Sequence, residues 1–200
     1  MKTLILGAGG QLGREWLHFL SDSHIPHLGA TSAEGDITQP ALIAELLDRE
    51  RPAVVVNCAA YTKVDKAESE PERAFLVNGW AVGKLAEACA ERKIKLVHYS
   101  TDYVFAGHRD DAKSFPKGYP EDHPKAPINT YGASKADGET RLAASGCEFL
   151  LIRVAWLCGA HGPNFVKTML KLGAERDELR VVADQRGAPS FADNVVANTW

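Results

Sequence analysis

The stretch TLILGAGGQLG, residues 3–13, decides the fold. Its apolar start, Thr3–Leu6, predicts a strand buried on both faces of a parallel sheet, and a helix is expected over Gln11–Leu20. The glycine-rich turn between them lets the backbone approach a pyrophosphate, which the free N–H groups and positive dipole end of the helix would stabilise. Glycines also collect in helix caps and tight turns, so the place of this turn between a strand and a helix carries the inference. The predicted cofactor-binding glycines here are Gly7, Gly10 and Gly13.

Short apolar runs alternate with longer segments of helical period along the rest of the chain, which is the pattern of βαβ units. Further strands are predicted over Val54–Asn57, Lys95–Ser100, Phe149–Arg153 and Leu179–Val182. Further helices are predicted over Leu42–Arg49, Glu72–Arg92, Tyr131–Ala144 and Asn164–Glu175. The predicted fold class is α/β, a Rossmann-type doubly wound parallel sheet, with residues 1–155 as an NAD(P)-binding domain.

Composition and charge narrow the classes of partner. The chain has 200 residues, 45% of them apolar and 24% charged, which suits one globular domain or one domain and part of a second. Its net charge is −3 and its acidic and basic residues are interspersed, which indicates neither nucleic acid nor an anionic membrane surface. The four cysteines share no CxxC spacing and no apolar run reaches transmembrane length, so we expect a cytoplasmic protein. The histidines form no HExxH motif, and no metal site is predicted.

Two polar motifs stand where an open α/β sheet binds ligands. The segment YSTDYVFAG, residues 99–107, follows the carboxyl end of a predicted strand. The segment YGASK places Tyr131 and Lys135 at i and i+4, on one face of a predicted helix. A neighbouring ammonium would lower the pKa of the phenol and suit it to proton donation, whereas an exposed helix with an unrelated Tyr and Lys is the alternative. Together with the Gly-x-x-Gly-x-x-Gly spacing, this pair resembles the short-chain dehydrogenase/reductase superfamily.

A more specific resemblance spans nearly all of the chain. Six segments, in this order, resemble the dTDP-4-dehydrorhamnose reductase family: NCAAYTKVDKAESEPERAFLVN, HYSTDYVFAG, PINTYGASKADGE, RVAWLCG, NFVKTML and VVADQRGAPS. The resemblance implies an enzyme that uses NADPH or NADH to reduce the C4 ketone of dTDP-4-dehydrorhamnose, or of a related dTDP-6-deoxy-4-hexulose, in nucleotide-sugar biosynthesis of the dTDP-L-rhamnose type. A homodimer is one assembly that it allows. Some members use Mg²⁺ at a subunit contact, which these residues do not support.

The same resemblance implies roles for individual residues. Thr101 would hydrogen-bond the reacting carbonyl, Tyr131 would donate the proton, and Lys135 would modulate Tyr131 and bind a cofactor ribose. Asp102 and Trp156 would contact the sugar. The pyrophosphate would be lined by Gly10, Gln11 and Leu12. Other cofactor contacts would come from Asp36 and Ile37 at the adenine end, from Ala59, Ala60, Tyr61 and Thr62 along the middle, and from Tyr99 beside the nicotinamide. Structural roles stay open for some polar or aromatic side chains: a turn carboxylate for Asp36, core packing for Trp156, and hydrogen bonds to buried backbone for Asn57 and Asn78.

The end of the second strand bears on the choice of cofactor. An acidic residue there would favour the free 2′-hydroxyl of NADH. The segment His27–Ser32 has neither an acid nor an arginine, and its small hydroxyl side chains admit a 2′-phosphate. We therefore expect a slight preference for NADPH, with NADH accepted.

Some residues depart from the family pattern. Cys158 stands where the family usually has tyrosine and Ala136 where leucine usually follows the lysine, and both are interpreted as packing changes. The sequence ends at Trp200 within an expected helix, whereas family chains normally continue through more of a C-terminal substrate lobe. The resemblance therefore implies that residues 156–200 begin a small substrate-binding lobe that is incomplete. That keeps open a non-catalytic NADP-binding regulatory subunit, like that of methionine adenosyltransferase, which resembles the same family. Sugar-nucleotide dehydratases are a third interpretation, but they usually carry an acidic pair after the threonine, and here Tyr103 follows Asp102.

Overall fold

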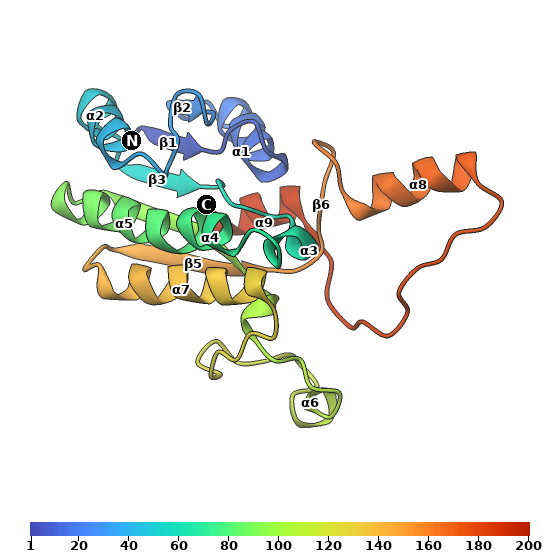
Figure 1. The fold of residues 1–200 in the computed structure, drawn as a ribbon. Coiled ribbons are helices and arrows are strands. Elements are labelled where there is room, and N and C mark those ends of the chain that lie inside the picture. The colour runs from blue at the N-terminus through green and yellow to red at the C-terminus, as the bar shows by residue number, and fades with distance from the viewer.

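A parallel five-stranded sheet forms the centre of the computed structural model, which describes residues 1–200 (Figure 1). Its strands are β1 (Thr3–Leu6), β2 (His27–Ala30), β3 (Val54–Asn57), β4 (Lys95–Thr101) and β5 (Phe149–Val154). They lie in the order β2-β1-β3-β4-β5, and every pairing is parallel. The order reverses between β1 and β3, and folds of this kind bind ligands at the carboxyl ends of the strands beside such a reversal.

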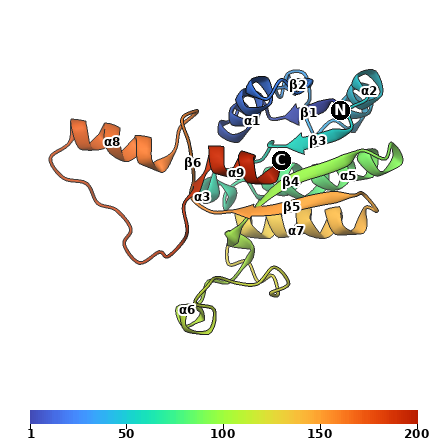
Figure 2. The same ribbon diagram turned by 180° about the vertical axis from the view of Figure 1, so that it is seen from behind.

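Helices cover both faces of the sheet, as the Rossmann-type prediction requires (Figures 1 and 2). Helices α1 (Gln11–Asp22) and α9 (Ala192–Thr199) lie on one face, where Trp16 and Val196 are fully buried. Helices α2 (Pro40–Glu50), α5 (Ala81–Glu91) and α7 (Thr130–Ala144) cover the other face and bury Leu46, Leu85 and Leu142. The sequence prediction of a doubly wound α/β fold is confirmed.

Most predicted elements are present, with small shifts. The strand predicted over Leu179–Val182 is wrong, because that segment is irregular and its Val181 and Val182 side chains are 49% and 67% exposed. An apolar run needs a neighbouring strand to pair with, and none lies beside it. Instead β6 (Leu157–Cys158) and β7 (Ser190–Phe191) form a separate two-stranded sheet, which the sequence did not predict.

The helix predicted over Glu72–Arg92 is interrupted by a π-helix. It begins as α4 (Pro71–Phe75), passes through the π-helical segment η1 (Leu76–Trp80) and continues as α5, with the short α3 (Val64–Ala67) before it. Within η1, Asn78 hydrogen-bonds the backbone N–H and carbonyl of Tyr61 and donates to the Ser134 hydroxyl, at 2.8, 2.9 and 3.0 Å. The π-helix thus fixes the loop after β3 against α7. Asn57 accepts a hydrogen bond from the Ala59 N–H, so the structural role considered for both asparagines is confirmed.

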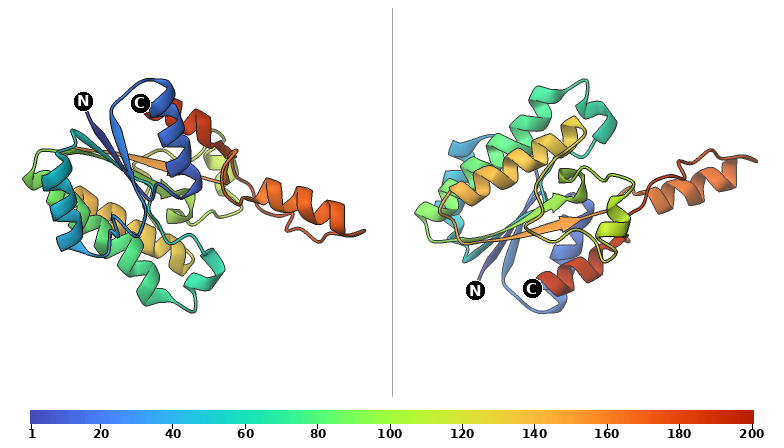
Figure 3. Two further views of the ribbon diagram at one scale, coloured as in Figure 1. Left: turned by 90° about the horizontal axis from the view of Figure 1, so that it is seen from above. Right: turned by 90° about the horizontal axis from the view of Figure 1, so that it is seen from below.

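The remaining segments extend from this core. Between β4 and α7 lie the 3₁₀ turn η2 (Asp102–Val104) and α6 (Asp111–Ser114), and the aromatic rings of Phe115, Tyr119 and His123 pack on one another there. Helix α8 (Phe165–Glu175) projects away from the sheet (Figure 3). No helix combines the length and the apolar composition needed to cross a bilayer. The division of the chain at residue 155 stays a prediction.

Candidate active site at the carboxyl ends of the strands

The glycine turn after β1 lies directly against the loop after β3. Gly7 has φ of 73°, and a Cβ built on it would lie 2.6 Å from the Ala59 nitrogen. A Cβ at Gly13 would lie 2.3 Å from the Gly7 carbonyl oxygen, so side chains are excluded from both positions. Helix α1 has no side-chain cap, and the N–H groups of Gln11, Leu12 and Gly13 donate no hydrogen bond within the chain. Free donors at a helix N-terminus beside a bare backbone turn fit a pyrophosphate.

The Gln11 side chain has a structural role as well. Its amide donates to the Leu157 carbonyl at 3.0 Å, and its amide oxygen accepts from Asn164 at 2.9 Å. Asn164 in turn caps α8 by accepting from the Lys167 N–H. The start of α1 is thereby joined to the segment that leads into α8, and only the backbone of Gln11 stays free for a ligand. Leu12 belongs to α1, and its side chain is buried in the hydrophobic core between this helix and the sheet.

The residues predicted at the adenine end lie in a turn between β2 and α2. The Asp36 carboxylate accepts hydrogen bonds from the Thr38 N–H and hydroxyl at 2.9 and 2.7 Å, which is the turn role left open by the sequence. Ile37 is buried among core residues. Sequence reasoning missed Glu34, whose carboxylate accepts from both the N–H and the hydroxyl of Thr31 at the end of β2. The sequence signal that could have identified Glu34 is an acidic residue a few positions after the end of a strand.

The loop after β3 presents small side chains toward the glycine turn. Ala59 and Ala60 are half-buried and Thr62 is exposed. Tyr61 is buried, and its hydroxyl donates to Glu70 at 2.8 Å, so its ring is held in the structure of the loop. The backbone of this loop therefore borders the cofactor position that the sequence predicts.

Thr101, Asp102 and Tyr131 meet at the carboxyl end of β4. Thr101 is 4% exposed, and its hydroxyl donates to the Asp102 carboxylate at 3.0 Å and accepts from the Tyr103 N–H at 3.2 Å. Burial raises the pKa of the Tyr131 phenol to about 12; the Thr101 hydroxyl opposes this shift and the charge of Asp102 adds to it. Burial likewise raises the pKa of Asp102. The sequence predicted a lowered tyrosine pKa, and the difference arises because desolvation dominates in this structure.

Lys135 is buried behind Tyr131, one helical turn along α7. It is 2% exposed, and its ammonium donates to the Tyr99 carbonyl at 2.6 Å. Burial lowers the pKa of Lys135 to about 8, against an opposing contribution from Glu139. The Tyr99 phenol itself points into the core, where it accepts from the Trp16 indole N–H at 2.9 Å and donates to Thr199 at 3.2 Å. The backbone of Tyr99, and not its phenol, therefore contacts the predicted site residue Lys135.

His98 is a second buried ionisable group near Lys135 that sequence reasoning did not single out. Its ring contacts the Asn57 amide at 3.1 Å, and the other ring nitrogen, Nε2, has no hydrogen-bond partner. Burial, together with the charge of Lys135, holds the pKa of His98 well below its ordinary value. A neutral ring follows, which leaves Lys135 as the cation of this buried cluster.

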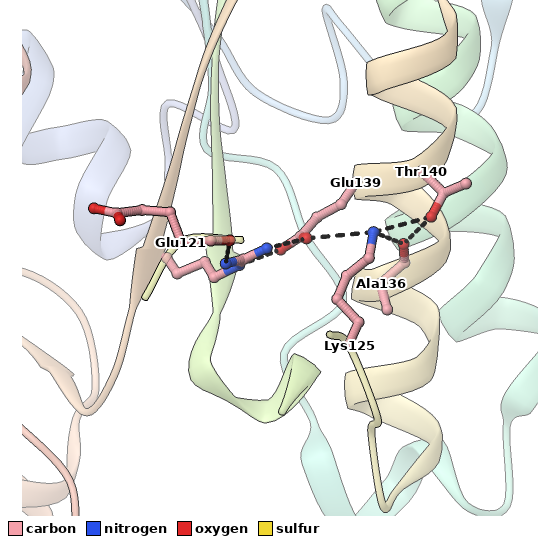
Figure 4. A network of polar contacts seen from close by, with 6 residues as sticks. Glu121, Lys125, Ala136, Glu139 and Thr140 are labelled. Atoms are coloured by element: carbon pink, nitrogen blue, oxygen red, sulfur yellow. Dashed lines mark hydrogen bonds and ion pairs between the residues drawn. The ribbon is translucent and has the colours of Figure 1, made fainter. Parts of the chain in front are cut away.

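An ion network surrounds Glu139, which lies on α7 one helical turn after Lys135 (Figure 4). Glu139 is 3% exposed and accepts two hydrogen bonds from the Arg153 guanidinium, at 2.9 and 2.8 Å. Lys125 lies 3.6 Å from the same carboxylate and donates to the Ala136 carbonyl and the Thr140 hydroxyl. Arg153 also donates to the Glu121 carbonyl and stacks over Phe105, with its Cζ atom 4.8 Å from the ring centroid. The network ties β5 and the loop before α7 to the helix that carries Tyr131 and Lys135.

Trp156 follows β5 in a strained backbone conformation. Its φ is 44°, which is rare for a bulky residue, and its side chain is 47% exposed. The indole packs over Gly187, where a Cβ would lie 2.9 Å from the ring atom Cε2. The rest of the indole is exposed at the carboxyl edge of the sheet, and contact of Trp156 with a sugar stays a prediction. No group of three or more His, Cys, Asp or Glu side chains is arranged to hold a metal ion.

Comparison with known proteins places this site in a family. The family model described as the RmlD substrate binding domain matches residues 1–200. A dTDP-4-dehydrorhamnose reductase of Burkholderia thailandensis is 44% identical over 201 residues, which cover 100% of this chain and 64% of that protein. The corresponding reductase of Escherichia coli (strain K12) is 40% identical, with 96% of this chain and 64% of that protein covered.

The solved structures agree. The crystal structure of dTDP-4-dehydrorhamnose reductase from Bacillus anthracis str. Ames in complex with NADP is 39% identical, has a TM-score of 0.92, and is matched over 99% of this chain and 68% of its own. This chain thus spans slightly under two thirds of the length of the curated relatives named above. With its full length matched by the family model and its fold superimposing on those reductases, the chain belongs to the RmlD family, the family of dTDP-4-dehydrorhamnose reductases.

Proposed function

We propose that this chain supplies the cofactor-binding and catalytic parts of a reductase for a dTDP-4-keto-6-deoxy sugar. Hydride from NADPH or NADH would reduce the C4 ketone to a secondary alcohol, as in dTDP-L-rhamnose biosynthesis. Relatives named as dTDP-4-dehydrorhamnose reductase and dTDP-4-keto-6-deoxy-D-glucose reductase support the substrate class. Within this class, we propose dTDP-4-dehydrorhamnose or a related dTDP-6-deoxy-4-hexulose as the sugar that is reduced.

One observation carries the proposal. The carboxyl end of β4 gathers Thr101, Tyr131 and the buried ammonium of Lys135, and the glycine turn with free N–H groups follows β1 at the same edge of the sheet. This arrangement brings together a proton donor, a hydrogen-bond donor for a carbonyl oxygen and a fixed cation. These are the groups that ketone reduction requires of the protein when a dinucleotide supplies the hydride.

The residues of the chain have distinct tasks in this reaction. Tyr131 donates its phenolic proton to the carbonyl oxygen as that oxygen gains charge, and a pKa of about 12 keeps the proton on the phenol at neutral pH. Thr101 turns its hydroxyl from Asp102 to the same oxygen. The positive charge of Lys135 favours the phenolate that remains and holds a cofactor ribose hydroxyl. Trp156 presents its exposed indole to the sugar.

The cofactor fits the residues present. The backbone N–H groups of Gln11, Leu12 and Gly13 would hold the pyrophosphate, and the excluded side chains at Gly7 and Gly13 leave room for it. A bound dihydronicotinamide supplies the hydride. The solved relative in complex with NADP supports a nicotinamide dinucleotide as the class of cofactor.

The test is oxidation of NADPH or NADH by the purified chain in the presence of dTDP-4-dehydrorhamnose. Absorbance at the nicotinamide band follows oxidation, and chromatography of the dTDP-sugar follows formation of the alcohol. We expect equal amounts of oxidised cofactor and reduced sugar. Binding of the cofactor without any turnover would contradict a catalytic role and favour the regulatory one.

A further inference from the structure

The turn that follows β2 carries a carboxylate fixed at the strand end. Glu34 Oε2 accepts hydrogen bonds from the Thr31 N–H at 2.7 Å and from the Thr31 hydroxyl at 2.5 Å. The N–H groups of Glu34 and Gly35 donate back to the Thr31 carbonyl, at 3.1 and 2.8 Å. The other carboxylate oxygen, Oε1, accepts no hydrogen bond within the chain. Glu34 is thus held in place by one oxygen and presents the other to solvent.

The end of β2, beside which this carboxylate is held, lies next to the glycine turn. The Ala8 N–H donates to the Ala30 carbonyl at 3.1 Å, and a Cβ built on Gly9 would lie 3.8 Å from Thr31 Cγ2. The end of β2 therefore borders the proposed pyrophosphate position. In dinucleotide-binding folds of this topology the adenosine ribose lies at the end of the second strand, where an acid accepts a hydrogen bond from the 2′-hydroxyl.

We propose that Glu34 recognises the adenosine ribose through Oε1 and makes the site prefer NADH to NADPH. The inference rests on the proposed function, because it concerns the cofactor of the same site. It reverses the slight preference for NADPH expected from the sequence. That expectation considered only the segment up to Ser32, whereas the turn folds a later acid back onto the strand end.

The charges around this position decide between the two cofactors. A 2′-phosphate would meet the charge of Glu34 and would find the N–H and hydroxyl of Thr31 already engaged by it. The cation near the glycine turn is Arg14, whose Nε donates to the Gly9 carbonyl at 3.1 Å from the first turn of α1. In water, a phosphate dianion about 5 Å from a carboxylate weakens binding by about tenfold. Beside the glycine turn, Arg14 would attract the pyrophosphate that both cofactors share, whereas the charge of Glu34 would act on the 2′-phosphate that only NADPH carries.

The test is a direct measurement of dissociation constants for NADH and NADPH by nicotinamide fluorescence, without substrate. It compares the unchanged chain with Glu34→Gln and Glu34→Ala, and with Glu45→Gln as a control at an exposed carboxylate on α2. We expect tighter binding of NADH by the unchanged chain. Both Glu34 variants should bind NADPH about tenfold more tightly and NADH a few-fold more weakly, and the control should match the unchanged chain.

Two results would overturn the inference while leaving the proposed function standing: tighter binding of NADPH by the unchanged chain, or a ratio of the two dissociation constants that stays the same in both Glu34 variants. Failure of the unchanged chain to bind either cofactor would instead contradict the proposed function, and this inference with it.

Discussion

Replacing Glu139 with Gln tests whether the ion network around Glu139 holds α7 in place. The substitution removes the negative charge that faces Arg153, Lys125 and Lys135 and leaves the three cations close together. Removal of one partner from a buried ion pair costs about 3–5 kcal/mol. Because the Arg153 side chain is 20% exposed and Gln can still accept one hydrogen bond, we expect about 2–3 kcal/mol.

Thermal unfolding measures this loss. For a chain of this size, each kcal/mol lowers Tm by about 2–4 °C, so Glu139→Gln should lower Tm by about 4–12 °C. Asp137→Asn is the matched control, because Asp137 lies on the same helix and pairs with Arg141, whose side chain is 46% exposed. Surface pairs contribute about 0–1 kcal/mol, so the control should lower Tm by less than about 4 °C. Equal effects of the two substitutions would refute the reasoning.

Three further predictions concern the site and its supports. Turnover should fall as the pH rises above about 8, because Lys135 has a lowered pKa of about 8 and loses its positive charge there; a kcat/KM profile that is flat from pH 7 to 10 would contradict this. Asn78→Ala should lower the free energy of unfolding by about 2–4 kcal/mol in urea titration, because it leaves the buried N–H and carbonyl of Tyr61 unpaired, whereas the exposed Asn198→Ala should have little effect. Gln11→Ala should speed hydrogen exchange in residues 157–167 while the exchange of β1 and β3 stays the same, since it breaks the bonds to Leu157 and Asn164; uniform acceleration would show a global effect instead.

The strands were predictable where burial determines composition. β1 and β3 have the predicted bounds, because a strand covered by helices on both faces must be almost entirely apolar. The segment Leu179–Val182 is also mostly apolar, apart from Arg180, but it has no strand to pair with, and pairing is a property of the whole fold. The π-helical turn at Leu76–Trp80 depends on Asn78 bonding to a distant loop, which no local pattern reveals.

The candidate site likewise has features that local sequence predicts and features that depend on tertiary packing. The glycine turn and the Tyr131 and Lys135 pair follow from local spacing, so the sequence located them. Glu34 lies at the end of β2 only because a hydrogen-bonded turn returns it there. The raised pKa of Tyr131 could not be predicted either, because desolvation depends on the packing of several elements around the phenol.

Measuring both turnover and cofactor binding in the Tyr131→Phe variant tests the central claim most directly. The phenol is the proposed proton donor, whereas the glycine turn holds the dinucleotide, so the two properties should separate. We expect Tyr131→Phe to bind NADH and NADPH within about threefold of the unchanged chain and to lose about 100-fold or more of its turnover with dTDP-4-dehydrorhamnose. Tyr119→Phe, which removes a phenol from the loop before α7, serves as the control and should keep its turnover. Near-normal turnover of Tyr131→Phe would contradict the account.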